Sequence, residues 1–531
     1  MQGFGPSLTG VPVGKCVVER ASTRSATCFL GLAICFGWIL FSGWMAKPLV
    51  ARDEVVRPNV LFIAIDDLRP EMGAYGVDAA QTPQLDRLAA QSVMFSRHYV
   101  QVPTCGASRF AMLTGRSPWE SDITRQNNAF FSPSSPISRE ATPGAQTMPE
   151  LFRRHGYYTI CIGKISHTPD GRVYAYNGEG DGHPELPHAW DELATPYGPW
   201  KRGWGAFFAY AGGAHREDGK GNAELFEFTA DQDDDLPDGL MASAAISKLR
   251  ELAKDEKPFF LGLGFFKPHL PFVATEADWQ AFAESDIPFP DSPEKLDSRY
   301  WHGSGEFYRY RTSWPKTKPL TPAAQLTAKR AYLASVRYTD RQVGRVLRSL
   351  DELGLRENTI VVVWGDHGWH LGEHAIWGKH SPFEVALRSV LMIRAPQVSQ
   401  QGAVCRALVE TTDLFPTLVD LCDLHEHSAQ HPLAGTSLRP LLEKPTESIR
   451  STAISYWGKV VSIRTDQYRL IATRGENEDP RTWQGLELYD QSQSDSPCEN
   501  LVETKPEVVE QILKSASERL NKDVESSLIH Q

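Results

Sequence analysis

Two pairs of neighbouring residues with metal-ligating side chains follow apolar runs of the sequence. Asp66 and Asp67 stand directly after one run, and Asp366 and His367 stand after another. Three carboxylates and one imidazole form a donor set dominated by hard oxygen, which suits calcium or magnesium better than zinc. A single Asp–Asp pair after a strand is as often a pair of turn residues, so the interpretation depends on the two pairs meeting. Together they predict one composite metal site.

Cys105 is a third candidate for chemistry. It lies in the run Val-Pro-Thr-Cys-Gly-Ala-Ser-Arg, between a strand-like segment and a helix-like segment. The ordinary alternative for a cysteine of an exported protein is burial or a disulfide bond. Arg109 follows four residues later, and on a helix this spacing lets its guanidinium reach back towards residue 105. The spacing therefore predicts that Arg109 serves the same site as Cys105.

Most of the chain alternates between strand-like apolar runs and helical patterns. Strands are predicted over residues 60–65, 258–266 and 359–364, and helices over residues 82–91 and 323–353. This alternation is typical of an α/β fold with a mostly parallel central sheet flanked by helices. Ligands of such sheets bind outside the carboxyl ends of the strands. The pairs at 66–67 and 366–367 are therefore expected to meet there.

The pattern changes after about residue 447 to short alternating runs, at residues 453–457, 460–464, 468–473 and 486–490. These runs predict a smaller C-terminal antiparallel sheet, on which an amphipathic helix over residues 506–521 would pack. The expected organisation is a large catalytic domain over residues 56–448 and a small α+β subdomain over residues 449–531.

The N-terminal residues have the composition of an export leader. Three basic residues precede an uncharged stretch over residues 25–46. We expect residues 1–51 to contain a signal peptide cleaved near Ala46 or Ala51, which places the protein in the periplasm or outside the cell. The stretch is also long enough to span a bilayer, so an uncleaved N-terminal membrane anchor is the alternative.

The overall composition argues against a nucleic-acid-binding protein. The 531-residue chain has a formal net charge of −11 and no long basic run, whereas proteins that bind phosphate backbones gather Lys and Arg on one face. Beyond the leader an odd number of cysteines is left, so at least one thiol is unpaired or modified. These cysteines are Cys105, Cys161, Cys405, Cys422 and Cys498. Disulfides among the last four, and the oligomeric state, are left open.

The run around Cys105 resembles the sulfatase signature Cys-x-Pro/Ala-Ser-Arg, whose cysteine is oxidised after translation to formylglycine by a sulfatase-maturing enzyme. Other segments resemble the iduronate-2-sulfatase branch of that family, at residues 59–70, 163–167, 266–271, 365–369 and 378–379. The resemblance extends from about residue 59 into the C-terminal subdomain. It implies an alkaline-phosphatase-like fold and an enzyme that removes sulfate from a sulfated carbohydrate.

The resemblance also implies that one calcium ion is held by Asp66, Asp67, Asp366, His367 and the formylglycine derived from Cys105. The ion would neutralise sulfate oxygens and polarise the aldehyde hydrate. One hydroxyl of the hydrate would attack sulfur, and the second would let the sulfated hydrate collapse to the aldehyde and expel sulfate. A plain serine or cysteine would stay trapped as a covalent sulfate ester.

Five further matched side chains have expected roles. Arg109 is expected to hold the hydrate and the metal-binding carboxylates. Lys164 and Lys379 are expected to hold the sulfate and to stabilise charge in the transition state. His269, between two prolines that stiffen its loop, is the expected general acid for the leaving alcohol. His167 is the expected base of the second half-reaction. Taken alone, such lysines are usually solvated and such histidines are usually structural.

Two alternative functions are kept. The first is a phosphate or phosphonate ester hydrolase on the same scaffold, which zinc content and activity on phosphate esters would favour. The second is a non-catalytic protein that binds a sulfated glycan and keeps Cys105 as a thiol.

Four residues that follow the pair Asp366 and His367 are candidates to line a substrate pocket: His370, His374, Trp377 and His380.

Overall fold

The computed structural model describes residues 57–529 apart from four gaps, at residues 220–222, 397–399, 425–428 and 476–482. The signal peptide or anchor predicted over residues 1–51 lies outside the described residues. No helix of the described part combines the length and the hydropathy needed to cross a membrane. The five cysteines of that part are all free thiols, so no disulfide links them.

An eight-stranded sheet forms the centre of the structure. In order across the sheet, its strands are β14 (Ala403–Cys405), β2 (Val93–Phe95), β13 (Leu391–Arg394), β9 (Thr359–Gly365), β1 (Asn59–Ile65), β7 (Phe259–Phe265), β4 (Tyr158–Gly163) and β5 (Glu192–Leu193). β1 pairs in parallel with β7 and β9, and β4 pairs in parallel with β7 and β5. Only β13 runs antiparallel to its described neighbours, β9 and β2. The mostly parallel central sheet is therefore confirmed.

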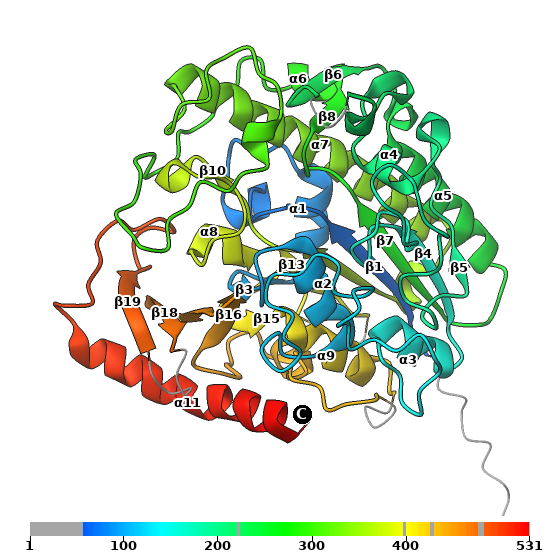
Figure 1. Cartoon of the computed structure of the whole chain (residues 1–531). Helices are drawn as coiled ribbons and strands as arrows, with labels where there is room; N and C mark the ends of the chain where they lie inside the picture. Colours follow the sequence, from blue (N-terminus) through cyan, green and yellow to red (C-terminus); the bar gives the residue numbers. More distant parts are fainter. Residues whose placement is uncertain (1–56, 220–222, 397–399, 425–428, 476–482, 530–531) are drawn as a thin grey trace, which may run out of the picture. The chain divides into compact units, whose positions relative to one another are not determined.

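Helices cover both faces of this sheet (Figure 1). The α-helices of the described residues are α1 (Pro83–Ala89), α2 (Cys105–Thr114), α3 (Met148–Arg154), α4 (Gly203–Phe207), α5 (Pro237–Leu252), α6 (Glu276–Gln280), α7 (Pro322–Glu352), α8 (Glu384–Leu387), α9 (Leu414–Leu421), α10 (Arg439–Glu443) and α11 (Pro506–Ile529), the last of which packs on the C-terminal sheet instead. Successive residues of a strand face opposite ways. Leu61 and Ile63 of β1 accordingly share a core with α5 and α7, whereas Phe62 and Ala64 share one with α2, α3 and α9. Because both faces are buried, the central strands consist almost entirely of apolar residues.

Three small sheets lie outside the central sheet and the C-terminal sheet. They are formed by β12 (Arg388–Ser389), β3 (His98–Tyr99) and β15 (Val409–Glu410), by β10 (His370–Leu371) and β11 (Trp377–Gly378), and by β6 (Phe226–Ala230) and β8 (Phe272–Thr275). β10 and β11 pair antiparallel as a hairpin. This hairpin matters to the site because Lys379 follows it directly.

The C-terminal part forms a four-stranded antiparallel sheet in chain order. Its strands are β16 (Ala453–Trp457), β17 (Val460–Arg464), β18 (Tyr468–Arg474) and β19 (Trp483–Asp490). α11 lies along this sheet (Figure 1), and its residues Val509, Ile512 and Ala516 share a hydrophobic cluster with Val461 and Ile463 of β17. The smaller antiparallel sheet with a helix is thus confirmed, while a domain boundary between residues 448 and 449 stays a prediction.

Glu384 of α8 joins this C-terminal sheet to the rest of the described chain. Its buried carboxylate lies 3.0 Å from Nε of Arg464 in β17 and 2.6 Å from Nη2 of Arg469 in β18. Tyr99 of β3 donates its hydroxyl to the other carboxylate oxygen at 2.8 Å. Burial by itself would raise the pKa of Glu384, but the two guanidinium groups hold that pKa at about 2.

Replacing Glu384 with glutamine is expected to lower the free energy of unfolding near neutral pH by about 3 kcal/mol, because two buried guanidinium groups lose their counter-charge. The carboxyl pKa is lower in the folded state than the ordinary value of 4.5. Its stabilising contribution is therefore complete above that pH and is lost as the pH falls towards 2. The difference between wild type and variant should accordingly shrink on acidification.

Urea unfolding at neutral and at acidic pH measures this difference. Glu443→Gln is the control, because Glu443 also faces an arginine but is 54% exposed. A loss at neutral pH no larger than that of the control would contradict the expectation.

Candidate active site

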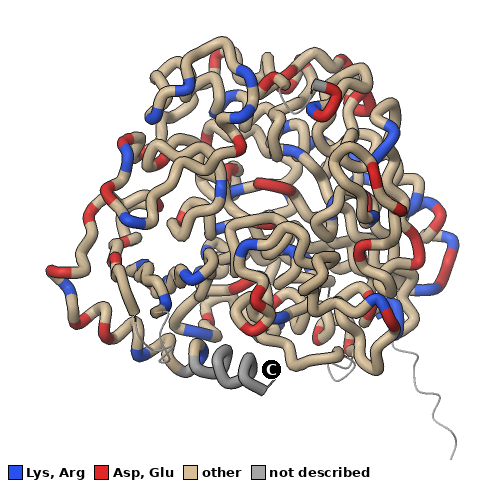
Figure 2. Tube along the Cα trace, in the orientation of Figure 1, with Lys and Arg blue, Asp and Glu red and all other residues tan. Residues whose placement is uncertain are grey.

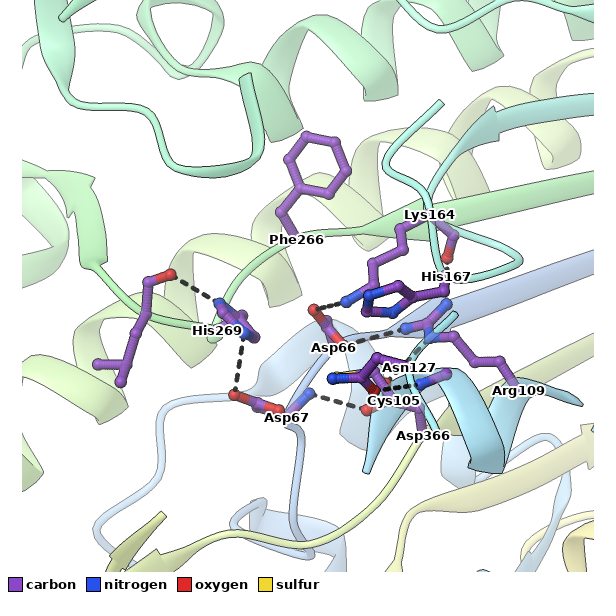
Figure 3. Close-up of polar contacts among 12 residues, drawn as sticks. Asp66, Asp67, Cys105, Arg109, Asn127, Lys164, His167, Phe266, His269 and Asp366 are labelled. Atoms are coloured by element: carbon purple, nitrogen blue, oxygen red, sulfur yellow. Dashed lines mark hydrogen bonds and ion pairs between the residues drawn. The ribbon is translucent and has the colours of Figure 1, made fainter. Parts of the chain in front are cut away.

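Neighbouring parallel strands of the central sheet end at the same level and deliver polar side chains there. Ile65 of β1 lies beside Phe265 of β7 and Gly365 of β9. The residues that come next are Asp66 and Asp67 after β1, Asp366 and His367 after β9, Lys164 after β4, and the loop to His269 after β7. Figure 3 shows Asp66, Asp67, Asp366, Lys164 and His269 pointing towards one another. The structure thus brings together the two pairs that the sequence singled out.

Cys105 is the first residue of α2, a helix in which every residue is buried. Arg109 lies one turn further along, and its side chain is fully buried. Its Nε lies 3.0 Å from Asp366 Oδ2 and its Nη2 lies 3.2 Å from Asp66 Oδ1. Its Nη1 donates to the carbonyl oxygen of Lys164. One guanidinium therefore ties together the ends of β1, β9 and β4.

Two lysines place their ammonium groups against carboxylates. Lys164 Nζ lies 2.7 Å from Asp66 Oδ2. Lys379 Nζ lies 2.7 Å from Asp67 Oδ1 and 3.1 Å from Cys105 Sγ. Burial alone would lower the pKa of each lysine, but the facing carboxylates raise both pKa values. Both lysines are therefore charged at neutral pH.

Asp66, Asp67, Cys105 and His367 form a buried group whose ligand atoms all lie within 4.8 Å of one another. Asp67 Oδ2 is buried and has no hydrogen-bond partner among the described residues. Asp366 lies at the side of this group, where its Oδ1 accepts the backbone N–H of Asp67 at 3.0 Å and lies 3.7 Å from His367 Nε2. A bound cation would satisfy the free oxygen of Asp67. The role of Asp366 as a ligand stays a prediction.

The carboxylates of this group repel one another in a buried place. Burial raises the pKa of Asp67 well above its usual range. The positive charge of Lys379 acts to lower this pKa, whereas repulsion by Asp66 and Asp366 acts to raise it. Burial, followed by the charge of Asp66, raises the pKa of Asp366 to about 6. Burial also acts on Asp66, but Lys164 and its other basic neighbours hold that pKa well below the usual range. Mutual repulsion of oxygen donors favours a hard divalent cation, so these residues fit calcium or magnesium.

His269 directs one ring nitrogen at the carboxylates. Its Nδ1 lies 2.6 Å from the carbonyl oxygen of Leu270, which can only accept, so in the neutral ring Nδ1 carries the proton. Its Nε2 lies 3.8 Å from Asp67 Oδ2 and 3.9 Å from Glu306 Oε2, and the first of these pairs is drawn in Figure 3. Burial, followed by the charge of Lys379, lowers the pKa of His269 well below its usual value. The ring is therefore neutral when nothing is bound.

His167 lies beside Lys164 in the same view (Figure 3). Its ring packs against Trp204 of α4 with centroids 5.7 Å apart. Its Nδ1 is buried and has no hydrogen-bond partner among the described residues. Burial, followed by the charge of Lys164, lowers the pKa of His167 well below its usual value. His167 is thus a neutral ring that can accept a proton.

Asn127 supports residue 105 but was missed by sequence reasoning. Its Oδ1 accepts the backbone N–H of Gly106 and the hydroxyl of Thr104, both at 3.0 Å. These residues flank Cys105, so Asn127 fixes the start of α2. Asn127 stands outside every motif that the sequence offered, and no signal pointed to it.

Two other residues hold the loop of His269 and were also missed. Lys267 Nζ donates to the carbonyl oxygens of His269 at 2.8 Å and of Pro271 at 2.7 Å. Asp238 accepts the backbone N–H groups of Phe266 and Lys267 at 3.0 and 2.8 Å. Lys267 lies in segment 266–271, one of the segments that prompted the resemblance, so its position in the sequence could have marked it as a site residue. Asp238 lies in α5, and nothing in its sequence context indicated the contact.

The residues expected to line a pocket after β9 have different places. His380 reaches the site, because its Nε2 lies 3.2 Å from Thr104 Oγ1. His370, His374 and Trp377 are buried. The Nε2 of His370 lies 2.8 Å from Ser381 Oγ, and the Trp377 ring stacks on Phe307. These contacts tie His370 and Trp377 to the loops around β10 and β11, and the expectation that His370, His374 and Trp377 line a pocket stays a prediction.

Comparison with protein families gives two matches. A family model described as Sulfatase matches residues 58–424, and one described as N-sulphoglucosamine sulphohydrolase, C-terminal, matches residues 372–526. Among curated relatives, the iduronate 2-sulfatase of Mus musculus is 32% identical over 70% of this chain, and the match covers 65% of the mouse protein, slightly under two thirds of its length. A protein of Formosa agariphila named Sulfatase is 30% identical over 86% of this chain and 87% of its own.

Solved structures with lower identity share the fold. A protein solved with its substrate D-glucosamine-2-N,6-O-disulfate is 21% identical, with a TM-score of 0.64 over 88% of this chain and 98% of its own. The phosphonate monoester hydrolase of Silicibacter pomeroyi is 22% identical, with a TM-score of 0.67 over 88% of this chain and 96% of its own. The fold is accordingly shared with a protein whose substrate is a sulfated glucosamine and with a phosphonate monoester hydrolase.

Proposed function

The chain belongs to the sulfatase family, and we propose that it is a sulfuric ester hydrolase that releases sulfate from a sulfated carbohydrate, as an iduronate-2-sulfatase-like enzyme. The observation that carries the proposal is the setting of Cys105. This residue begins α2, and its Sγ lies 3.1 Å from Lys379 Nζ and 3.3 Å from His367 Nε2. The family model covers residues 58–424 and so includes this cysteine, and the resemblance of the run around Cys105 to the sulfatase signature implies that the nucleophile is made from it.

Two groups beyond the translated chain would complete the site. Formylglycine, made from Cys105 by a sulfatase-maturing enzyme, would supply as its hydrate one hydroxyl that attacks sulfur and a second that permits sulfate release. One calcium ion held by Asp66, Asp67, Asp366, His367 and residue 105 would supply Lewis-acid neutralisation of sulfate oxygens. The other tasks fall to side chains of this chain.

The buried cations bind and orient the sulfate. Lys164 and Lys379 are charged, and their ammonium groups would hold sulfate oxygens and stabilise the charge that spreads over them in the transition state. Arg109 would act mainly by position, since its donors are already engaged by Asp66, Asp366 and the carbonyl oxygens of residues 164–165. Its removal would leave buried carboxylates without their counter-charge.

The two histidines divide the proton transfers. His269 would protonate the oxygen of the leaving alcohol from Nε2. The ring is neutral in the free protein, and the negative charge of a bound sulfate next to the carboxylates of Asp67 and Glu306 favours its protonated form. His167 would take the proton of the remaining hydroxyl at Nδ1, the nitrogen without a partner among the described residues.

Replacing His269 with alanine is expected to lower kcat/KM for sulfated carbohydrates by about a hundredfold or more, because an alcohol leaves poorly without a proton. Esters of acidic phenols, which leave without help, should lose far less. Initial rates with a sulfated disaccharide and with 4-nitrophenyl sulfate measure the contrast. His188→Ala is the matched control, since His188 binds the carbonyl oxygen of Arg139 away from the site. An equal loss for both ester classes would argue against the general-acid role.

The proposed function is tested by sulfate release from a sulfated disaccharide, compared with phosphate and phosphonate esters of the same alcohol. A much higher kcat/KM for the sulfate ester is the expected result. A preference for the phosphorus esters would favour the alternative hydrolase. Binding without release, by protein that carries formylglycine, would favour the non-catalytic glycan-binding alternative.

The organisation of the whole chain is part of the proposal. We assign catalysis to residues 56–448 and a supporting α+β subdomain to residues 449–531. The leader composition of residues 1–51 supports export to the periplasm or the cell exterior, where sulfated polysaccharides are met. N-terminal sequencing of the exported protein tests cleavage near Ala46 or Ala51.

A further inference from the structure

We propose that Arg125 and Trp457 form a subsite for an anionic substituent of the carbohydrate, a carboxylate or a second sulfate, beside the reacting sulfate. The inference rests on the function proposed above and adds to it the class of substrate. Neither residue belongs to the catalytic or metal-binding set. Arg125 lies in the loop after α2, and Trp457 ends β16 of the C-terminal sheet.

The loop that carries Arg125 is fixed to the start of α2. Asn127 binds the residues on both sides of Cys105, at Gly106 N and Thr104 Oγ1. Two residues of chain span at most about 7 Å. The backbone of Arg125 is therefore near the proposed nucleophile.

Trp457 is connected to the same place from the other side. The ring of His380 lies nearly parallel to that of Trp457, with centroids 5.1 Å apart and an interplanar angle of 14°. His380 also contacts Thr104 at 3.2 Å and directly follows Lys379. A substrate whose sulfate reaches Cys105 would accordingly pass close to Trp457.

The guanidinium of Arg125 is held in one place. Its Cζ lies 5.0 Å from the centroid of the Trp457 ring, and its Nη2 donates to the Trp457 carbonyl oxygen at 3.3 Å. Glycine at 458 makes room for it, because a Cβ atom there would lie 2.5 Å from Arg125 Nε. The N–H of Gly458 also donates to the carbonyl oxygen of Thr124 at 3.3 Å. The cation is thus positioned by an aromatic face and by main chain.

No carboxylate of the described residues forms an ion pair with this cation. Figure 2 shows Lys and Arg interspersed with Asp and Glu over the chain, and exposed arginines such as Arg153 and Arg439 pair with aspartates. Within the described part of the chain, no Asp or Glu oxygen lies within 4.0 Å of a nitrogen of the exposed Arg125. As far as the described residues go, its charge is therefore left for a ligand.

The chemistry of this surface selects the ligand class. A fixed guanidinium presents paired N–H groups that match the oxygens of a carboxylate or a sulfate. The Trp457 ring beside it contacts both the Arg125 guanidinium and the His380 ring, so it links the cation to the end of the site where the sulfate reacts. The enzyme should therefore prefer a carbohydrate that carries an anionic group close to the ester it cleaves.

Arg125→Ala tests the subsite with three sulfated disaccharides. The first carries a uronate carboxylate next to the sulfate ester, the second has this carboxylate reduced to an alcohol, and the third has a further sulfate in its place. Wild type is expected to favour the two anionic compounds over the neutral one in kcat/KM by about tenfold or more. In Arg125→Ala this preference should fall close to one, and the compound that loses more identifies the preferred anion.

Arg439→Ala is the control, because it removes an exposed arginine that is already paired with Asp420, and it should keep the wild-type preference. An unchanged preference in Arg125→Ala, or no preference in wild type, would overturn the proposal. If wild type hydrolyses none of the three esters, the proposed function fails, and calorimetric titration with the same compounds decides the subsite. Weaker binding of the anionic compounds by Arg125→Ala would then support it, and equal binding would overturn it.

Discussion

Replacing Cys105 with alanine is expected to lower kcat for sulfate ester hydrolysis by at least about a thousandfold, because it removes the side chain from which the proposed nucleophile is made. The fold should survive, since only one buried sulfur atom is deleted from a helix that many other contacts hold. Sulfate release by wild type and variant, both made alongside the same sulfatase-maturing enzyme, measures the effect.

Two companion variants sharpen this result. Cys498→Ala removes an exposed thiol and should keep wild-type activity. Cys105→Ser keeps one hydroxyl and lacks the second, so it should release at most one equivalent of alcohol per chain and then stop as a trapped sulfate ester. Sustained turnover by the serine variant, or a kcat for Cys105→Ala within about tenfold of wild type, would contradict the role of residue 105.

Removing divalent cations with a chelator is expected to abolish activity and to lower the thermal midpoint, and added calcium should restore both. Without an ion, the buried carboxylates of Asp66, Asp67 and Asp366 repel one another, and Asp67 Oδ2 has no hydrogen-bond partner among the described residues. An ion that binds the folded state alone stabilises it by about 2.7 kcal/mol when its free concentration is a hundred times Kd. Activity and thermal unfolding, before and after dialysis against chelator, measure both effects.

Asp67→Asn should blunt the response to calcium, because it removes a charged oxygen donor. Asp340→Asn is a control matched in burial: Asp340 accepts backbone N–H groups of Gln84 and Leu85 in α1. It should lose some stability and keep the calcium response. Full activity in protein freed of calcium and magnesium, or recovery with zinc alone, would contradict the proposed metal site.

Much of this arrangement could be predicted from local sequence. The apolar runs that became β1, β7 and β9 are buried on both faces, so their composition alone marked them as central strands. The rule that ligands gather at the carboxyl ends of parallel strands then predicted that Asp66 and Asp366 would meet. The predicted proximity of Cys105 and Arg109 is confirmed because both residues lie on one helix, one turn apart.

Contacts between distant segments could not be predicted in this way. His370, His374 and Trp377 are near Asp366 in the sequence, but the hairpin of β10 and β11 turns them into the protein interior. Trp457 reaches His380 only because β16 lies beside that part of the main body. Such placements depend on tertiary packing, for which a single sequence carries no periodic signal.

Mass spectrometry of the tryptic peptide spanning residues 98–109 tests the central claim most directly. The protein is made alongside a sulfatase-maturing enzyme, and the peptide is treated with a thiol-alkylating reagent and with a hydrazide. The account predicts that residue 105 carries an aldehyde, which reacts with the hydrazide and resists alkylation. A thiol at residue 105, under conditions in which a control sulfatase is fully converted, would contradict the formylglycine mechanism and favour the glycan-binding alternative.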